Sequence, residues 1–168
     1  MEYGRDWRRK QMRKPGISSL TRGAAVAALY TVLTLLLPFA SAGTVEIRFS
    51  EALCVLPMLM PEAIPGLAVG CLITNLLHGA VLYDVIFGTL ATLLAAVLTR
   101  FLREKPLLAA LMPALSNGVI VGMVLYFGYQ IGFPLYVCML SVAAGEAVVC
   151  CTLGLLLLKY LKKTKLFS

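Results

Sequence analysis

Acids and amides that lie within apolar stretches are the residues of this sequence best suited to chemistry. Glu146, in the stretch SVAAGEAVV, is the only acid or base between residues 106 and 158. An ionised acid at the centre of a membrane-spanning helix costs about 2.5–3.5 kcal/mol, so such a residue usually faces a cavity or a partner. Asn117, in LSNGVIVG, lies in the same window. Glu146 is therefore a candidate binding residue or a structural acid, protonated or paired with Arg48. Asn117 is a candidate ligand contact or the source of an interhelical hydrogen bond.

A cluster of charge occupies VEIRFSE, residues 45–51, just before a strongly apolar run. Its two carboxylates and one guanidinium, on Glu46, Glu51 and Arg48, are candidate contacts for a charged solute. The alternatives are local. Ser50 would cap a helix with Glu51 in its first turn, where the helix dipole favours an anion. Arg48 would then simply pair with Glu46 or Glu51.

Three further polar residues, Asn75, His78 and Asp84, lie around the boundary between two apolar segments. Asn75 and Asp84 are candidate binding residues, and capping of a helix is the alternative for Asp84. His78 is better explained as an interfacial residue, because the chain has no second histidine to share a metal ion. The five cysteines all lie in apolar runs without metal-site spacing, so we predict no metal site.

This set of side chains suits a small planar or cationic solute. A carboxylate can accept two parallel hydrogen bonds from the N–H edge of a guanine-like base, and it can pair with an ammonium group. An asparagine amide offers both a donor and an acceptor. Aromatic residues at the outer edge of such a pocket can stack on a flat ring.

The elements that position these residues are membrane-spanning helices. The chain has 168 residues and is 60% hydrophobic, with a mean hydropathy of +0.89 and only 14% charged residues. Soluble domains carry about 25% charged residues, which makes this composition typical of a membrane protein. The net charge of +7 comes from basic residues that flank apolar windows, at 5–22, 100–105 and 159–165. That placement indicates cytoplasmic flanks rather than nucleic-acid binding.

Charge placement predicts an all-α integral membrane protein with six transmembrane helices and both termini cytoplasmic. The expected spans include 20–40, a short or re-entrant span at 51–61, 107–129 and 134–158. Two more spans lie between 63 and 100, the first ending and the second beginning near Asp84. We expect a basic N-terminal arm at 1–19, a six-helix substrate-binding domain at 20–160 and a basic tail at 161–168. The candidate residues then lie in the outer half of the membrane or near its middle.

Small residues four apart mark close helix contacts, as in the pairs Gly66/Gly70 and Gly118/Gly122. Ala24 and Ala28 form a similar pair in the first span. Internal packing explains each pair, and docking to another membrane protein is the alternative for Ala24 and Ala28. The sequence contains no phosphate-binding loop, so uptake against a gradient would need an energised partner or a coupling ion.

Several stretches in this order resemble the QueT family over about residues 20–160: RFSEALCVLP, AIPGLAVGCLITNLL, DVIFGTLATLLAA, NGVIVG and GEAVVCCTLGLLLL. Members of this family are substrate-binding S components of energy-coupling factor (ECF) transporters linked to queuosine precursors. The family pattern is expected to read Q-x-R-x-S-E-A-L, whereas this chain has Glu46 at the position of the glutamine. An acid there would favour a cationic solute or pair with Arg48.

The resemblance implies a six-helix fold with an outward-facing pocket and a partner module in the cell membrane. That module consists of a transmembrane coupling protein and two ATPases, which would use ATP and magnesium, while this chain itself needs no cofactor and is no enzyme. Ala24 and Ala28 resemble the motif through which S components dock. The implied solute is 7-aminomethyl-7-deazaguanine or queuine. The alternatives are an S component for another vitamin-like solute, a membrane-embedded enzyme, and a structural subunit that binds no small molecule.

Overall fold

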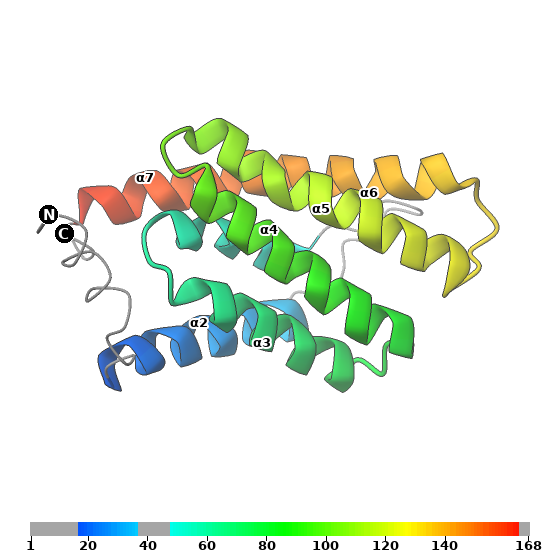
Figure 1. The fold of residues 1–168 in the computed structure, drawn as a ribbon, viewed down its shortest axis with the longest axis horizontal. Helices are drawn as coiled ribbons and strands as arrows, with labels where there is room; N and C mark the ends of the chain where they lie inside the picture. Colours follow the sequence, from blue (N-terminus) through cyan, green and yellow to red (C-terminus); the bar gives the residue numbers. More distant parts are fainter. Residues whose placement is uncertain (1–16, 37–47, 165–168) are drawn as a thin grey trace, which may run out of the picture.

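The computed structural model describes residues 17–36 and 48–164, and the helices lie roughly alongside one another in one bundle (Figure 1). The described part of the chain contains no β-strand. In chain order the elements are α2 (Ile17–Leu36), the 3₁₀ helix η1 (Phe49–Met58), α3 (Ala63–Leu77), the π-helical turn η2 (Asp84–Gly88), α4 (Thr89–Phe101), α5 (Pro106–Phe127), α6 (Leu135–Val149), the π-helical turn η3 (Cys150–Gly154) and α7 (Leu155–Lys163). The prediction of an all-α protein is confirmed.

Four continuous helices are long and apolar enough to cross a membrane: Ile17–Leu36, Asp84–Phe101, Pro106–Phe127 and Leu135–Lys163. The second of these joins η2 to α4, and the fourth joins α6, η3 and α7. The other two helices, α3 and η1, are shorter apolar segments. From the rise of each helix type, α3 is about 22 Å long and η1 is about 20 Å long. The six predicted helices are therefore present, and the second is short, as the sequence indicated.

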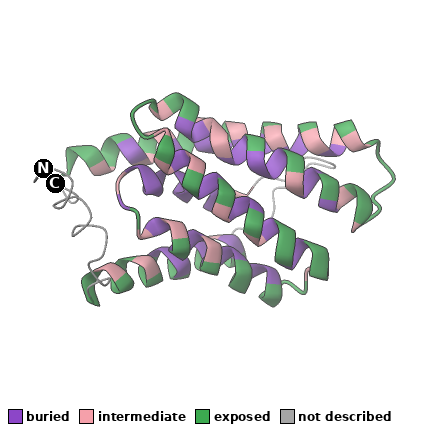
Figure 2. Cartoon of the chain, viewed as in Figure 1, coloured by how far each residue is buried: buried purple, intermediate pink, exposed green. Residues whose placement is uncertain are grey.

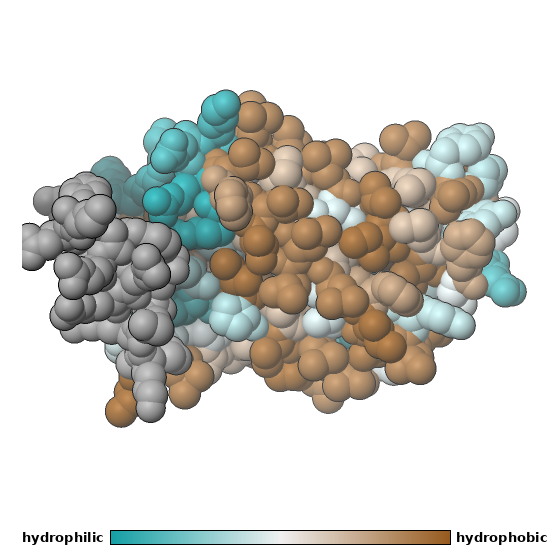
Figure 3. All heavy atoms as spheres, in the orientation of Figure 1, coloured by the Kyte–Doolittle hydropathy of each residue, from teal (hydrophilic) through white to brown (hydrophobic). Residues whose placement is uncertain are grey.

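The outer surface of the bundle is apolar along its length. Figure 2 shows the buried residues on the sides of the helices that face one another, with exposed residues on the outward sides. Figure 3 shows this outward surface as hydrophobic over most of the visible face. It carries many large apolar side chains, among them Leu77, Leu115, Leu140 and Leu156. A surface of this kind is suited to lipid, because soluble proteins rarely expose contiguous apolar patches beyond a few hundred Å².

Hydrophilic residues gather where α4 meets α5 and where α7 ends (Figure 3), and α2 begins at the same end of the bundle (Figure 1). We call this the basic end, and it carries Arg22, Arg100, Arg103, Lys105, Lys162 and Lys163. The described chain therefore starts and finishes at one end, as an even number of helices requires. Asn75, Asp84 and the turn between α5 and α6 lie toward the opposite end.

Glycines bring α3 against α2 and α5 against α6. A Cβ added at Gly66 would lie 2.5 Å from the carbonyl oxygen of Gly23 on α2. A Cβ added at Gly122 would lie 2.6 Å from the Cα of Met139 on α6. The pairs Gly66/Gly70 and Gly118/Gly122 are thus internal packing positions, as predicted. Ala24 and Ala28 are exposed on α2.

Side chains from α4 satisfy backbone carbonyls that prolines leave without a donor. Pro113 has no N–H to offer the carbonyl of Ala109, and the Thr99 hydroxyl donates to that oxygen at 3.1 Å. Similarly, Pro61 follows the end of η1, and the guanidinium of Arg100 donates to the carbonyls of Pro57 and Met58 at 3.0 and 3.2 Å. Arg100 therefore fixes the end of η1 nearest the basic end, a contact that charge placement alone did not reveal.

Candidate solute-binding site

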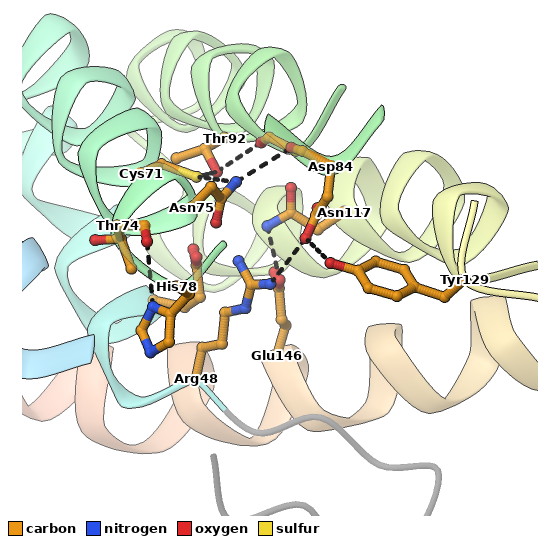
Figure 4. A network of polar contacts seen from close by, with 12 residues as sticks. Arg48, Cys71, Thr74, Asn75, His78, Asp84, Thr92, Asn117, Tyr129 and Glu146 are labelled. Atoms are coloured by element: carbon orange, nitrogen blue, oxygen red, sulfur yellow. Dashed lines mark hydrogen bonds and ion pairs between the residues drawn. The ribbon is translucent and has the colours of Figure 1, made fainter. Parts of the chain in front are cut away.

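Polar side chains from five segments converge inside the bundle (Figure 4). Arg48 directly precedes η1, Asn75 lies on α3, Asp84 begins η2, Asn117 lies on α5 and Glu146 lies on α6. All five were predicted as binding residues from the sequence. In Figure 4 the guanidinium of Arg48 points toward the region between Asp84 and Glu146. The fold thus brings together side chains that lie far apart in the sequence.

Asp84 makes several contacts in this network. It lies in the part of the network that is farthest from the basic end. Its Oδ2 lies 3.8 Å from Nη2 of Arg48 and accepts a hydrogen bond from the Tyr129 hydroxyl at 3.1 Å. The Asn75 amide donates to the Asp84 backbone carbonyl at 3.1 Å. Gly88 makes room for this arrangement, because a Cβ there would lie 2.7 Å from Oδ1 of Asp84 and 3.2 Å from Nδ2 of Asn75.

Tyr129 is a member of the network that the sequence reasoning missed. It follows α5, in the turn before α6. A six-span topology places that turn at the same membrane face as Asp84. The position of Tyr129 in GYQIGFP therefore indicates that its hydroxyl can reach the start of the fourth span, and this signal was present in the sequence.

Asn117 and Glu146 form a direct pair between α5 and α6. The Asn117 amide nitrogen donates to Oε1 of Glu146 at 2.7 Å, and the two residues are only 2% and 4% exposed. Glu146 lies three turns after the start of α6 at Leu135, which is about 17 Å along a helix. Half of a hydrocarbon core about 30 Å thick is about 15 Å, so this position along α6 agrees with a depth near mid-membrane, which stays a prediction. The interhelical hydrogen bond expected for Asn117 is also present.

Glu51 lies in the first turn of η1, at the start of the second span, as the sequence interpretation expected, but its side chain contacts Tyr30 and Cys54. It is fully buried; its Oε1 accepts from the Tyr30 hydroxyl at 2.5 Å and its Oε2 from the Cys54 thiol at 2.9 Å. Its backbone carbonyl accepts from the thiol of Cys150, which lies one turn beyond Glu146 toward the basic end. This burial was not predicted, and it arises because η1 is buried from Ser50 to Met58.

The capping interpretation of this region is only partly correct. Glu51 does lie in the first turn of η1, but the residue at the N-cap is Arg48 and no side chain makes a capping hydrogen bond. Ser50 is completely buried within the helix. Glu46 lies outside the described residues, so its predicted contact with the solute stays a prediction. His78 ends α3, and its Nδ1 lies 3.1 Å from the Thr74 carbonyl oxygen.

The described interior contains more acids than cations. Glu51, Asp84 and Glu146 are buried in it. Among the described cations, only Arg48 lies away from the ends of the long helices. Carboxylate groups accept hydrogen bonds and attract cations. This site is therefore suited to a ligand that brings hydrogen-bond donors or positive charge, and poorly suited to an anion.

Aromatic side chains line a hollow of about 510 Å³ at the turn between α5 and α6. Tyr126, Phe127 and Phe133 are among its lining residues, together with Gln130. The rings of Tyr126 and Phe127 meet edge to face with centroids 4.9 Å apart. The hollow lies next to Tyr129, on the side of the network away from the basic end, where a flat ring would first meet the protein.

Comparison with protein families matches residues 20–163 to a family described as QueT transporter. Comparison with curated proteins and with solved structures gives no match. The matched region contains every described helix except the first turn of α2. It therefore contains both the apolar bundle and the buried acids and amides. The chain belongs to the QueT transporter family.

Proposed function

We propose that this chain is the substrate-binding S component of an ECF transporter and that its solute is a queuosine precursor. The observation that carries the proposal is the buried network of Arg48, Asp84, Asn117 and Glu146 within the helices of a transporter-family chain. An acid and an amide that are each almost fully buried at mid-membrane depth are costly for a purely structural bundle. Binding of a polar solute offsets that cost.

The proposed topology has six crossings, with the basic end facing the cytoplasm according to the positive-inside rule. Asp84, Tyr129 and the aromatic hollow then face the outside. Asn117 and Glu146 lie deeper along the same path. A solute would enter past the aromatic rings and come to rest near the middle of the membrane. In this orientation both termini are cytoplasmic and the protein is a multi-pass component of the cell membrane.

The proposed solute, 7-aminomethyl-7-deazaguanine or queuine, matches the chemistry of these residues. The Asn117–Glu146 pair would face the N–H edge of the guanine-like ring, and Asp84 would lie closer to the positively charged amine. Asn75 contributes by fixing the backbone of Asp84. Both carboxylate oxygens of Glu51 already have donors from Tyr30 and Cys54. We therefore assign Glu51 a supporting role, in which it holds η1 and thereby Arg48 in place.

Energy for transport would come from partners. The proposed module comprises a transmembrane coupling protein and two ATPases that use ATP and magnesium. Ala24 and Ala28, exposed on α2, are the proposed docking positions. Ala24 also lines an apolar groove of about 330 Å³ between α2 and α3 near the basic end. A small-residue surface of this kind permits close approach of another helix in the membrane.

The test is thermal stabilisation of the purified full-length protein in detergent. The ligands are 7-aminomethyl-7-deazaguanine, queuine, queuosine and guanine, with thiamine and riboflavin as controls. A ligand that binds only the folded state must raise its stability by mass action. A shift with one deazaguanine names the solute, and a smaller shift in Glu146→Gln places it at this site. A shift with thiamine or riboflavin alone would indicate a different solute. Conversion of a ligand without ATPase partners would indicate an enzyme.

A further inference from the structure

Asn117 holds a carbonyl oxygen inside the bundle that receives no hydrogen bond from any described residue. The side chain is 2% exposed, and its amide nitrogen is already engaged with Glu146. Most buried polar atoms in proteins have a partner, and a buried acceptor without one destabilises the folded state. Such an atom at a candidate binding site indicates that its donor comes from the solute.

Glu146 determines which side of the Asn117 amide is available. An asparagine amide has a donor side and an acceptor side. Oε1 of Glu146 accepts from the amide nitrogen at 2.7 Å, so the carbonyl oxygen must point the other way. Figure 4 shows that oxygen on the side of Asn117 opposite Glu146, toward the part of the network that contains Asn75 and Asp84.

Close packing keeps the two helices that carry this pair in register. A Cβ added at Gly118, next to Asn117, would lie 2.8 Å from the Cβ of Ala143 on α6. One turn further, a Cβ at Gly122 would contact the backbone of Met139. Neither helix can slide or rotate to give Asn117 another partner without breaking these contacts. The orientation of the amide is therefore built into the fold.

We propose that Asn117 is the specificity-determining acceptor of this site: its Oδ1 receives an N–H of the solute, and Glu146 is the positioning residue that presents this oxygen. The proposal rests on the proposed function for the location of the site. It adds the direction of one hydrogen bond, in which the solute donates and Asn117 accepts. A solute with an N–H at this position binds. An analogue that presents a lone pair there is rejected, since two acceptors would face each other. Sites built around a hydrogen bond discriminate strongly against analogues that cannot make it.

The first experiment compares ligands that differ by one donor, using the full-length protein in detergent and calorimetric titration. The probes are 7-aminomethyl-7-deazaguanine, its analogue without the 2-amino group and its N1-methyl analogue. In the wild type, loss of the relevant donor should weaken binding roughly 5- to 100-fold. In Asn117→Leu the parent probe should bind more weakly by a similar factor. The analogue without that donor should then bind this variant with the same affinity as the parent probe. Ser116→Ala, which removes the neighbouring buried hydroxyl, is the matched control and should keep the wild-type pattern.

Glu146→Gln tests the positioning role. A glutamine can either donate to or accept from Asn117, so the amide is free to turn and present its NH₂ group. The ratio of affinities between the parent probe and the donor-deleted analogue should therefore shrink toward one. A purely structural role for Glu146 would change both affinities equally and leave the ratio intact. An unchanged ratio, or a donor penalty that persists in Asn117→Leu, overturns the proposal.

The second experiment needs no ligand. In the double variant Asn117→Leu/Glu146→Leu both buried polar groups are gone. If the pair exists for binding, the empty protein should melt at the same temperature as the wild type or higher, as expected where function is kept at the expense of stability. A lower melting temperature would show that the pair holds the fold together and would overturn the proposal. If the wild type binds none of the probes, the proposed solute is wrong, and this melting comparison decides the role of Asn117 by itself.

Discussion

Replacing Tyr30 with phenylalanine tests the assignment of Glu51 to support rather than to direct solute contact. The change removes a hydroxyl whose oxygen lies 2.5 Å from Oε1 of Glu51, and both residues are almost completely buried. A distance of this size is typical of a strong hydrogen bond between two oxygen atoms. The ring itself is retained, so the core packing around it changes little.

The expected loss follows from that geometry. Hydrogen bonds to charged groups are worth about 1.5–3 kcal/mol, and a buried carboxylate oxygen left without its donor brings the cost of Tyr30→Phe to about 2–3 kcal/mol. For a chain of this size, that corresponds to a fall in melting temperature of about 4–12 °C. The Cys54 thiol still donates to the other carboxylate oxygen, so the protein should fold.

The assay is thermal unfolding of the purified protein in detergent, followed by titration of its solute. Tyr160→Phe is the matched control, because Tyr160 is 65% exposed. This control should change the stability by less than about 0.5 kcal/mol. If Glu51 only supports η1, solute affinity in Tyr30→Phe should stay within about twofold of the wild type. Wild-type stability in Tyr30→Phe would refute the hydrogen-bond argument. Unchanged stability with a large loss of affinity would return Glu51 to the binding site.

Three other substitutions test separate parts of the structure by the same melting and titration measurements. In Arg100→Met the two carbonyls at the end of η1 lose their donor. The protein should therefore be destabilised by about 2 kcal/mol. Arg103→Met, on an exposed neighbour, should not have this effect, and equal effects of the two would contradict this assignment. In Gly122→Leu the new side chain would overlap the backbone of Met139. The expected cost is about 3 kcal/mol or more, and normal stability would show that α5 and α6 are not in close contact. Asp84→Asn should lower the affinity for the positively charged probe by about 30-fold or more and lower the affinity for guanine less. Equal losses of affinity for the two ligands would exclude a contact between Asp84 and the amine.

The sequence was a sufficient guide to the membrane class and to the number of helices, because these depend on length, hydropathy and the placement of charge. Glu146 and Asn117 could be located at mid-membrane depth for the same reason, since a regular helix advances by a constant rise per residue. An interhelical hydrogen bond was expected for Asn117, but its partner, Glu146, could not be predicted. Contacts between helices depend on how each helix is rotated about its axis, and a single sequence with weak amphipathicity does not determine that rotation.

The burial of Glu51 was not predicted because it depends on backbone conformation. Residues 51–61 were expected to form a short or re-entrant span, and in the structure residues 49–58 form a 3₁₀ helix that is buried from Ser50 to Met58. Prolines at 57 and 61 disfavour a regular α-helix here, yet they do not specify what replaces it. The role of Arg100 was missed for a related reason. Its charge indicated a membrane face, whereas its contacts depend on where η1 ends.

Departures from α-helical geometry occur where the buried acids lie. Glu51 is part of the 3₁₀ helix η1, Asp84 is the first residue of the π-helical turn η2, and Glu146 precedes the π-helical turn η3 by one turn. Irregular backbone in a membrane is tolerated only where protein surrounds it, and the buried residues of η1 run without a break from Ser50 to Met58. A π-turn rotates the side chains on one side of it relative to those on the other and is frequent at functional sites. The directions of Glu51 and Asp84 therefore depend on irregular backbone, whereas Glu146 lies in the regular helix α6 one turn before such a segment. Insertion or deletion of one residue in η2 should therefore lower solute affinity more than Asp84→Asn does. Such a change would rotate every side chain that follows in the helix.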